Sequence, residues 1–231
     1  MTEEEAQAWL AKQGWWDSEG GDRLRRFVEL VLDEADRQNL ISGSSRPHIW
    51  ARHIADSAQL VRLAPPPRAD ADWIDLGTGA GFPGIVIACL RDSPMKLVEA
   101  RPLRVAFLQR CVDELGLRHA EVIGGKVENS RFREPAAVIS ARAYAPLDRL
   151  LMTARHLSDE KTVWLLPKGR QGEKELEIIR RDWQAVFHVE QSITDPESAI
   201  VTINQLVRRP SSFSYAPHGG RSNSSRVRKP S

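Results

Sequence analysis

The stretch Asp75-Leu76-Gly77-Thr78-Gly79-Ala80-Gly81 is the part of the chain whose residue types most directly suggest chemistry. It follows an apolar segment typical of a strand and precedes a segment typical of a helix, which is the context that a ligand-binding loop requires. Glycines let a backbone turn sharply and approach a ligand without a clash from Cβ. The alternative is a tight turn between strand and helix that holds no ligand.

The spacing of these glycines indicates which ligand the loop holds. A dinucleotide fingerprint has glycine at its first, third and sixth positions, whereas here the sixth position is Phe82. The pattern Asp-x-Gly-x-Gly-x-Gly is instead the usual form of loops that bind S-adenosylmethionine. That cofactor has no pyrophosphate, so the helix N-terminus need not collect phosphate charge. We therefore expect S-adenosyl-L-methionine as the cofactor, with Gly77 and Gly79 among its contacts.

An acid, Glu99, ends the next predicted strand, about 20 residues beyond the glycines. In doubly wound folds an acid at this place accepts hydrogen bonds from the hydroxyls of a ribose. A lone glutamate at a strand end is more often just solvated, but the glycine loop before it favours the ribose role. Asp75 and Glu99 also suit a cationic methyl donor, because opposite charges attract.

The elements that must position these residues alternate between strand and helix. We expect five strands at 73–76, 96–99, 120–123, 136–140 and 162–166, and an antiparallel closing pair at 186–193 and 199–207. Helices are expected at 85–90, from Pro102 to a C-cap at Gly116, between the fourth and fifth strands, and after Lys168. This alternation predicts an α/β fold with a doubly wound, mostly parallel sheet and helices on both faces.

The chain divides into three predicted parts. Residues 1–65 form an N-terminal helical cap, because apolar residues such as Leu24, Phe27 and Val31 recur at helical spacing and a second stripe follows Pro47. The prolines at 65–67 stop any helix and mark the boundary. Residues 66–209 form the S-adenosylmethionine-binding methyltransferase domain. Residues 210–231, rich in Ser, Gly, Pro and Arg, form a basic tail that we expect to be disordered.

Composition excludes a membrane-spanning protein and indicates a cytoplasmic one. The 231 residues are 41% hydrophobic and 28% charged, with no run of about 18 apolar residues. The first residues, Met1-Thr2-Glu3-Glu4-Glu5, are acidic where a signal peptide would be basic and then apolar. Cys89 and Cys111 are expected to be reduced thiols of the core rather than a disulfide.

Positive charge is concentrated towards the C-terminus, although the net charge is only +2. From Ser198 to the end there is no acid, and the basic residues are Arg208, Arg209, Arg221, Arg226, Arg228 and Lys229. A basic tail on a mildly acidic body suggests a polyanionic partner, although solvated tails of this kind are common.

Several methyl-acceptor chemistries leave marks that this sequence lacks. Methylation at C5 of a pyrimidine needs a thiolate, often in a Pro-Cys pair, but Cys89 follows Ala88 and Cys111 follows Arg110. Exocyclic amines usually require an Asn/Asp-Pro-Pro-aromatic tetrapeptide, which is also absent. A ring nitrogen such as guanine N7 has a free lone pair and needs no general base, so alignment alone can supply much of the catalysis. The sequence is compatible with N7 methylation.

In these and other motifs the chain resembles a known family, the bacterial 16S rRNA guanine-N7 methyltransferases, also called glucose-inhibited division protein B. The resemblance covers about residues 24–209 and includes two specific motifs, an Arg-His-Ile-x-Asp-Ser box at 52–57 and a Gly-Phe-Pro-Gly-Ile ending of the loop at 81–85. It also rests on Asn39-Leu40-Ile41, Leu97-Val98-Glu99, Arg104, Phe107-Leu108, Val127-Glu128, Ser140-Ala141-Arg142-Ala143 and Leu166-Pro167-Lys168-Gly169.

The resemblance implies a function and a set of cofactor contacts. Family members methylate one guanine of the small-subunit decoding region, numbered 527 in conventional rRNA numbering. The implied partner is therefore 16S rRNA or the small ribosomal subunit, and we expect a monomer. The implied cofactor contacts are Gly77, Phe82, Val127, Glu128 and Arg142. Phe82 could instead staple the helix to the sheet, and Glu128 could be an exposed loop acid.

For the RNA we expect contacts from Arg52, His53 and Lys168. Arg52 and Asp56 are i, i+4 neighbours on a predicted helix and can pair. His53 could instead be a buried, hydrogen-bonded histidine, and Lys168 simply an exposed lysine. A basic rim around the site is expected from Arg46, Arg101, Arg104, Lys168 and Arg170.

The sequence names no catalytic side chain and no metal ligand. Two alternative functions stay open beside guanine-N7 methylation of 16S rRNA. One is a methyltransferase of another RNA or of a small molecule, and the other is a nucleotide-binding module without chemistry.

Overall fold

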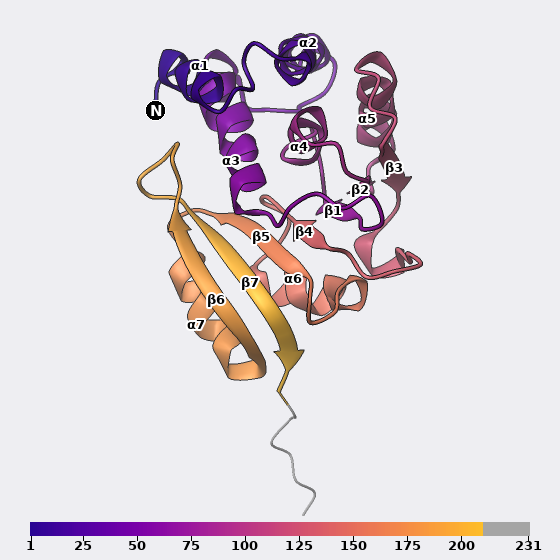
Figure 1. Ribbon diagram of the computed structural model, residues 1–231, viewed down its shortest axis with the longest axis vertical. Coiled ribbons are helices and arrows are strands. Elements are labelled where there is room, and N and C mark those ends of the chain that lie inside the picture. Colours follow the sequence, from indigo (N-terminus) through magenta and orange to yellow (C-terminus); the bar gives the residue numbers. More distant parts are fainter. Residues whose placement is uncertain (210–231) are drawn as a thin grey trace, which may run out of the picture.

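The computed structural model describes residues 1–209, in which seven strands form one sheet between two layers of helices (Figure 1). The strand order is β3-β2-β1-β4-β5-β7-β6. The strands are β1 (Trp73–Leu76), β2 (Met95–Glu99), β3 (Ala120–Gly124), β4 (Val138–Ser140), β5 (Val163–Lys168), β6 (Trp183–Gln191) and β7 (Ala199–Arg208). The first five run parallel, and β7 pairs antiparallel with both β5 and β6.

Helices cover both faces of this sheet. One layer holds α2 (Glu19–Glu34), α3 (Asp56–Leu63), α4 (Gly84–Leu90) and α5 (Pro102–Glu114), and the other holds α6 (Leu147–Ala154) and α7 (Gly172–Asp182). Two separate apolar clusters fill the two sides of the sheet, one around Phe27, Ile85 and Phe107 and the other around Trp164 and Leu151. The predicted doubly wound fold is confirmed. The strand order reverses between β1 and β4, which is where ligands of such sheets bind.

Short-range signals explain where the helices begin and end. In α1 (Glu3–Lys12) the Thr2 side chain accepts from the Glu5 amide while Glu5 accepts from the Thr2 amide, which satisfies two free donors of the first turn. Ser18 caps α2 by accepting from the Gly21 amide at 3.2 Å. Pro102 occupies the first turn of α5, and Gly116 follows its end with φ +63°, as expected for the C-cap.

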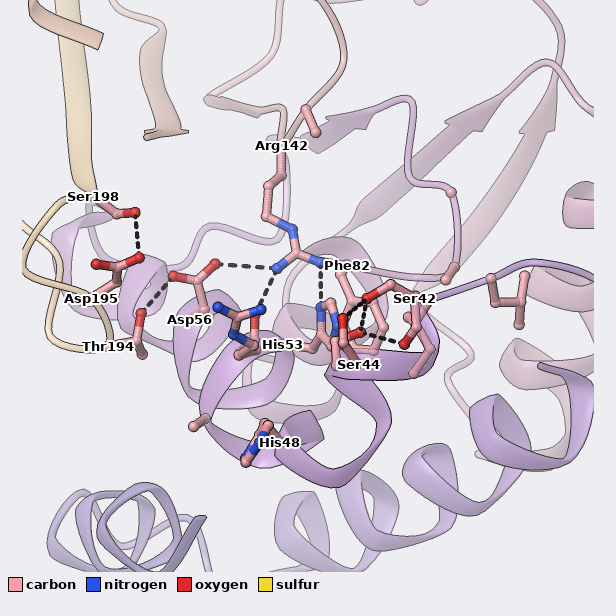
Figure 2. A pocket seen from close by; sticks show the side chains of 18 of the residues that line it. Ser42, Ser44, His48, His53, Asp56, Phe82, Arg142, Thr194, Asp195 and Ser198 are labelled. Atoms are coloured by element: carbon pink, nitrogen blue, oxygen red, sulfur yellow. Dashed lines mark hydrogen bonds and ion pairs between the residues drawn. The ribbon is translucent and has the colours of Figure 1, made fainter. Parts of the chain in front are cut away.

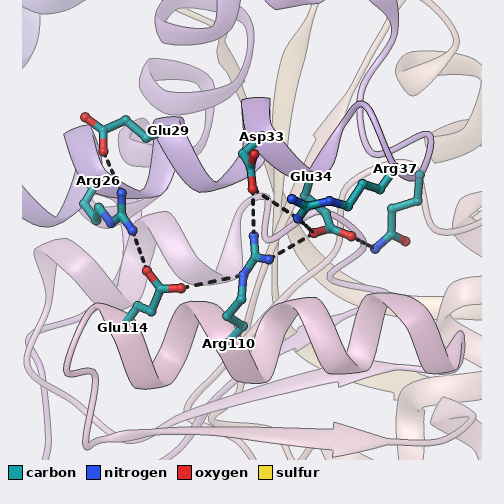
Figure 3. A network of polar contacts seen from close by, with 8 residues as sticks. Arg26, Glu29, Asp33, Glu34, Arg37, Arg110 and Glu114 are labelled. Carbon is teal, nitrogen blue, oxygen red and sulfur yellow. Dashed lines mark hydrogen bonds and ion pairs between the residues drawn. The ribbon is translucent and has the colours of Figure 1, made fainter.

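An ion-pair network holds α2 against α5 at the surface (Figure 3). Arg110 of α5 lies 3.2 Å from Glu34, and Arg26 of α2 lies 2.6 Å from Glu114. Glu34 is the most shielded carboxylate of the network, because its side chain is only 14% exposed. The network therefore joins the cap to the helix that follows β2.

The helix predicted after Pro47 forms as three different pieces. A 3-10 helix, η1 (Gly43–His48), leads into a π-helical turn, η2 (Trp50–Ala55), which continues into α3. The wider π turn places His53 and Asp56 on the side of the sheet where the strand order reverses. Such turns inside helices often occur at functional sites.

Some boundaries differ from those expected. Strand β4 starts at Val138 rather than 136, because the Ala136 amide bonds Leu157 and the Ala137 amide bonds Asp72 outside the ladder. Strand β6 covers 183–191 rather than 186–193, since Ser192 and Ile193 leave the strand to bond Gln59 of α3. Two short 3-10 helices, η3 (Val127–Asn129) and η4 (Arg155–Leu157), were not expected.

Both cysteines are free and buried, as expected. Burial raises the pKa of Cys89 to about 12 and also raises that of Cys111, so neither is a ready nucleophile. None of the helices within residues 1–209 has the length and apolarity needed to span a lipid bilayer. The division into parts at 65/66 stays a prediction, and the basic tail at 210–231 lies outside the described residues.

Candidate functional site

A cavity of about 1080 Å³ opens at the reversal point of the sheet, between the glycine loop and the N-terminal helices (Figure 2). Its walls come from distant parts of the chain: residues 40–56, the loop after β1, the loop after β4 and the β6–β7 loop. The structure brings together here six of the ten predicted site residues, namely Gly77, Gly79, Phe82, Arg142, Arg52 and His53.

The glycine loop has the backbone conformation that its composition predicts. Gly77 and Gly79 have φ values of +65° and +62°, which L side chains rarely adopt. A Cβ on Gly77 would lie 2.5 Å from Cδ2 of Tyr144, and one on Gly79 would lie 3.4 Å from a guanidinium nitrogen of Arg104. Both positions therefore favour glycine for the dihedral angle, and Gly77 needs it for the space as well.

Asp75 lies beneath the loop, is fully buried and is not among the residues that line the cavity. Its carboxylate accepts from the Ser140 hydroxyl at 2.7 Å and from the Gly84 amide at 3.0 Å. Burial raises its pKa to about 6, although these hydrogen bonds act in the opposite direction. Asp75 therefore ties β4 and the first turn of α4 to β1, and its attraction for a cationic donor stays a prediction.

Glu99 is also buried, with 6% of its surface exposed. One carboxylate oxygen accepts from the Gly79 amide at 2.9 Å, and the other accepts from the amides of Ala100 and Arg101. Glu99 therefore holds the glycine loop from behind and is not in the wall of the cavity. Its predicted bond to a ribose stays a prediction.

Phe82 packs against the N-terminal helices and also reaches the cavity, and its contact with a cofactor stays a prediction. It is 4% exposed and packs on Phe27 of α2 with ring centroids 5.2 Å apart. The His53 ring stacks on it at 4.8 Å, and the Arg142 guanidinium lies 5.3 Å from its centroid. Phe82 thus joins the cap to the loop and also forms part of the cavity wall.

The Arg142 guanidinium is held from three sides (Figure 2). One terminal nitrogen donates to the Asp56 carboxylate at 3.2 Å and to the Arg52 carbonyl at 3.1 Å, and the other lies 2.9 Å from Nδ1 of His53. Phe82 covers one face of the group. Because Arg142 is fixed by residues of the cap, it connects the end of β4 to the N-terminal helices.

This contact sets the protonation of His53. A guanidinium can only donate, so Nδ1 must accept and Nε2 must carry the proton. Burial, together with the nearby charges of Arg142 and Arg52, lowers the pKa of His53 to about 3, so the ring is neutral. Nε2 is buried and has no hydrogen-bond partner among residues 1–209.

The pairing expected between Arg52 and Asp56 is wrong. Asp56 pairs instead with Arg142, and its second oxygen accepts from Thr194 at 2.9 Å and Gln59 at 3.1 Å. Arg52 is exposed and lines the cavity with its side chain free of any ion pair within residues 1–209. Its charge is therefore available for a ligand.

Lys168, for which we expected an RNA contact, is not simply an exposed lysine. Its side chain is 11% exposed and its ammonium lies 2.8 Å from Glu175, in the wall of a second, adjoining cavity. The expected basic rim is also largely neutralised, because Arg170 pairs with Glu197 and Arg46 pairs with Asp36. Of the expected rim, Arg104 lines the main cavity.

Val127 and Glu128 lie in η3, away from the cavity wall. Val127 is buried, whereas Glu128 is exposed. Sequence reasoning missed Asp56 and the β6–β7 loop from Thr194 to Ser198, which line the cavity, and Tyr144, which lies against Gly77. For Asp56 a signal was present, because it lies three residues after His53 in the same motif.

The residues present suit S-adenosylmethionine. Gly77 and Gly79 give the cavity a wall of bare backbone, and Phe82 adds an apolar surface. In the same wall Asp56 partly offsets the positive charge of Arg142, which reduces its repulsion of a sulfonium cation.

Comparison with known proteins assigns the family. Residues 21–201 match the model of a protein family described as GidB, rRNA small subunit methyltransferase G. The chain belongs to this family. A ribosomal RNA small subunit methyltransferase G from Novosphingobium aromaticivorans is 44% identical over 99% of this chain and 98% of its own length. The corresponding protein from Sphingopyxis alaskensis is 49% identical over 86% of this chain and 84% of its own length. Membership confirms the predicted S-adenosylmethionine-dependent rRNA methyltransferase.

Solved structures of other methyltransferases share the fold of this chain. A SAM-dependent methyltransferase from Aquifex aeolicus is 13% identical, covers 68% of this chain and 92% of its own, and has a TM-score of 0.53. A glycopeptide N-methyltransferase, MtfA, in complex with S-adenosyl-L-methionine reaches 0.54 at 8% identity, over 65% of this chain and 86% of its own. These similarities show the class I methyltransferase fold and nothing about the acceptor.

Proposed function

We propose that the protein transfers a methyl group to N7 of guanine 527 in 16S rRNA. The observation that carries the proposal is the single cavity in which the glycine loop, the fixed Arg142 and the free cation of Arg52 converge. It offers a place for a cofactor and a place for a polyanion side by side. Membership of the rRNA methyltransferase family supports the choice of acceptor.

In this proposal the cofactor lies over the glycine loop. The backbone of Gly77 and Gly79 and the ring of Phe82 form its seat, and the remaining N–H groups of Arg142 suit its carboxylate. Glu99, Val127 and Glu128 are proposed for the adenosine end, since all three lie where β2 and β3 end. The cofactor supplies a methyl group on a positively charged sulfur.

The proposed methyl transfer requires no acid or base from the side chains. The N7 lone pair forms a bond to the methyl carbon, the bond from carbon to sulfur breaks, and the positive charge passes from the sulfur to the base. No proton has to move, so a neutral His53 and a buried Asp75 are compatible with the reaction. The task of the protein is to align the base with the methyl group, which can supply roughly 7–11 kcal/mol of the barrier reduction.

For the RNA we propose contacts from Arg52, His53 and Lys168. Arg52 is exposed at the mouth of the cavity and suits a phosphate. The substrate is 16S rRNA or the small subunit that contains it. We further propose a monomer, because one chain completes the cavity, and a cytoplasmic location, where that substrate is found.

A binding experiment tests the cofactor and the rival functions. Calorimetry is expected to show saturable binding of S-adenosylmethionine and none of NAD, since Phe82 replaces the glycine that the dinucleotide fingerprint needs. Binding of NAD alone would contradict the proposal. Tight binding of S-adenosylmethionine with no turnover on any RNA would favour a nucleotide-binding module.

Mass mapping of rRNA tests the acceptor. RNA from cells that lack the protein should miss one methyl group on guanine 527, and the purified protein should restore it. A methyl group missing from another RNA would favour the alternative of a different acceptor.

A further inference from the structure

A second cavity of about 480 Å³ adjoins the first at the ends of β4 and β5. The two cavities share Asp56, Arg142, Ala143 and Ser198 in their walls, so a ligand in one lies next to a ligand in the other. The second cavity contains no part of the glycine loop. It therefore lies on the side of Arg142 away from the proposed cofactor seat.

Its wall contains an ion pair whose hydrogen-bonding capacity is not used up. The Lys168 ammonium donates to Glu175 at 2.8 Å and to the Ala145 carbonyl at 3.2 Å, which leaves one of its three N–H groups free. The same Glu175 oxygen, Oε2, also accepts from the Leu147 amide at 2.8 Å. Its other oxygen, Oε1, accepts no hydrogen bond from any described residue.

The fold holds this pair firmly in place. Lys168 ends β5, and Glu175 belongs to the first turn of α7. The side chains are 11% and 24% exposed, and a Cβ on Gly172 would lie 2.8 Å from that of Lys168. A shielded ion pair adds little to stability in general, because desolvation of the charges offsets their attraction. A pair with spare donor and acceptor groups in a cavity wall is better explained by a ligand.

A free donor beside a free acceptor matches one edge of guanine. On its Watson–Crick edge O6 accepts, while N1 and the 2-amino group donate, so the ammonium fits O6 and the carboxylate fits N1–H and N2–H. Adenine presents the opposite order, an amino donor beside an acceptor nitrogen, and would place donor against donor. Enzymes that modify a base commonly take it out of the stack and recognise it by this edge.

The orientation also suits the reaction. In guanine N7 lies on the far side of O6 from N1, so a base held at O6, N1 and the 2-amino group has N7 free. The rings of Pro146 and Pro167 line the same cavity and offer apolar surfaces to a flat base. N7 would then face Arg142 and the first cavity, where the methyl donor is proposed to lie.

We propose that the second cavity seats the acceptor guanine, with Lys168 recognising O6 and Glu175 recognising N1–H and the 2-amino group. The assignment rests on the proposed function and adds its specificity-determining residues. Glu175 is new, and Lys168, proposed above only as a contact to the RNA, is now assigned to the base itself.

The test pairs an altered base with an altered residue. Small-subunit rRNA is assembled by ligation with either guanine or inosine at the target position, since inosine lacks only the 2-amino group. The wild-type protein is expected to lose roughly ten- to hundredfold in kcat/KM with inosine. The ratio of kcat/KM with guanine to kcat/KM with inosine should fall at least tenfold in Glu175→Gln, or to near unity where the wild-type ratio is small. The affinity of this variant for S-adenosylmethionine should stay the same.

Glu177→Gln is the matched control, because it is the same substitution at an exposed position of α7. It should keep the wild-type ratio of guanine to inosine. Any intrinsic difference between the two bases cancels when the ratios of the variants are compared.

Two results overturn the assignment. One is a wild-type protein that methylates guanine and inosine equally well, a result that needs no variant to fold. The other is a Glu175→Gln protein with the wild-type ratio. If the wild-type protein methylates neither RNA, the proposed function itself fails and the assignment fails with it.

Discussion

Arg142 is the residue on which the candidate site depends most. Three contacts from the cap and one aromatic face fix a side chain that begins at the end of β4. A guanidinium held in this way keeps its remaining donors in a defined direction, which is how enzymes reduce the entropy cost of binding. His53 and Asp56 contribute by positioning Arg142.

Gly77 allows a prediction in which dihedral strain and loss of space are separated. Gly116 has nearly the same φ, +63°, and a Cβ there would have no neighbouring atom within 4 Å, so Gly116→Ala should cost about 1 kcal/mol of unfolding free energy. Gly77→Ala adds a contact of 2.5 Å with Tyr144 and should cost roughly 1 to 3 kcal/mol more. It should also weaken S-adenosylmethionine binding at least tenfold. Urea unfolding and calorimetry measure both, and equal stability of the two variants would contradict the packing of Tyr144.

His53 allows a prediction about pH. Its pKa falls from 6.5 to about 3 on folding, mainly through burial, so its contribution to stability is complete above pH 6.5. As the pH falls from 6.5 towards 3, His53 becomes protonated in the unfolded chain but stays neutral in the folded protein, so the free energy of unfolding decreases. His53→Gln should therefore lose less unfolding free energy between pH 7 and 4 than the wild type does.

Urea titrations at several pH values measure this difference. Replacement of the exposed His188 by Gln is the control for the loss of a histidine elsewhere. Asp75 acts in the opposite sense, because its pKa rises from 3.8 to about 6 and its contribution is lost as the pH rises through 6. It is present in all three proteins and so cancels in the comparison. Parallel curves for His53→Gln and the wild type would show that His53 is not neutral in the fold.

At the scale of elements, the network between α2 and α5 permits a test with a matched control. Glu34 is 14% exposed and contacts both Arg37 and Arg110, so Glu34→Gln should cost about 1 kcal/mol of unfolding free energy. Glu29 is 65% exposed and, among residues 1–209, pairs with Arg26 alone, so Glu29→Gln should change stability by less than about 0.5 kcal/mol. Thermal unfolding at low and high salt separates the two. Equal costs would mean that shielding does not strengthen this network.

The sequence predicted the strands and the glycine loop well, because both depend on local patterns. A short apolar run before glycines locates β1 to within a residue, and the positive φ values follow from the glycines themselves. The contacts that complete the site depend on long-range packing, which the sequence does not express. The sequence pattern around Lys168 does not indicate that Glu175 pairs with it. It likewise does not indicate that Asp56 pairs with Arg142 rather than with Arg52.

At the scale of the whole molecule, the described part ends in a bonded position. The Arg209 amide donates to Asp182 at 2.8 Å, directly after β7. A chain that stops after Arg209 should therefore keep its unfolding free energy to within about 0.5 kcal/mol. It lacks four cations, Arg221, Arg226, Arg228 and Lys229, so its affinity for RNA should depend less steeply on salt.

Each phosphate that the shortened chain no longer neutralises should flatten the log–log slope by about 0.7 to 0.9. Titration of both chains with RNA at several salt concentrations measures the slope. The modified guanine should be the same for both, and a change in its position would show that the tail selects the target.

The walls of the main cavity have a consequence for how the protein is made. Asp56 bonds Thr194 and Gln59 bonds Ser192. The N-terminal partners of these bonds are therefore synthesised more than 100 residues before their C-terminal partners. At about 5–20 residues per second the intervening stretch takes several seconds or more to synthesise. During that time β1 to β5 can pair while the cavity still lacks one wall. A nascent chain interrupted before residue 198 would therefore hold the glycine loop and Arg142 without a closed site, and full activity would appear only after the β6–β7 loop has been made.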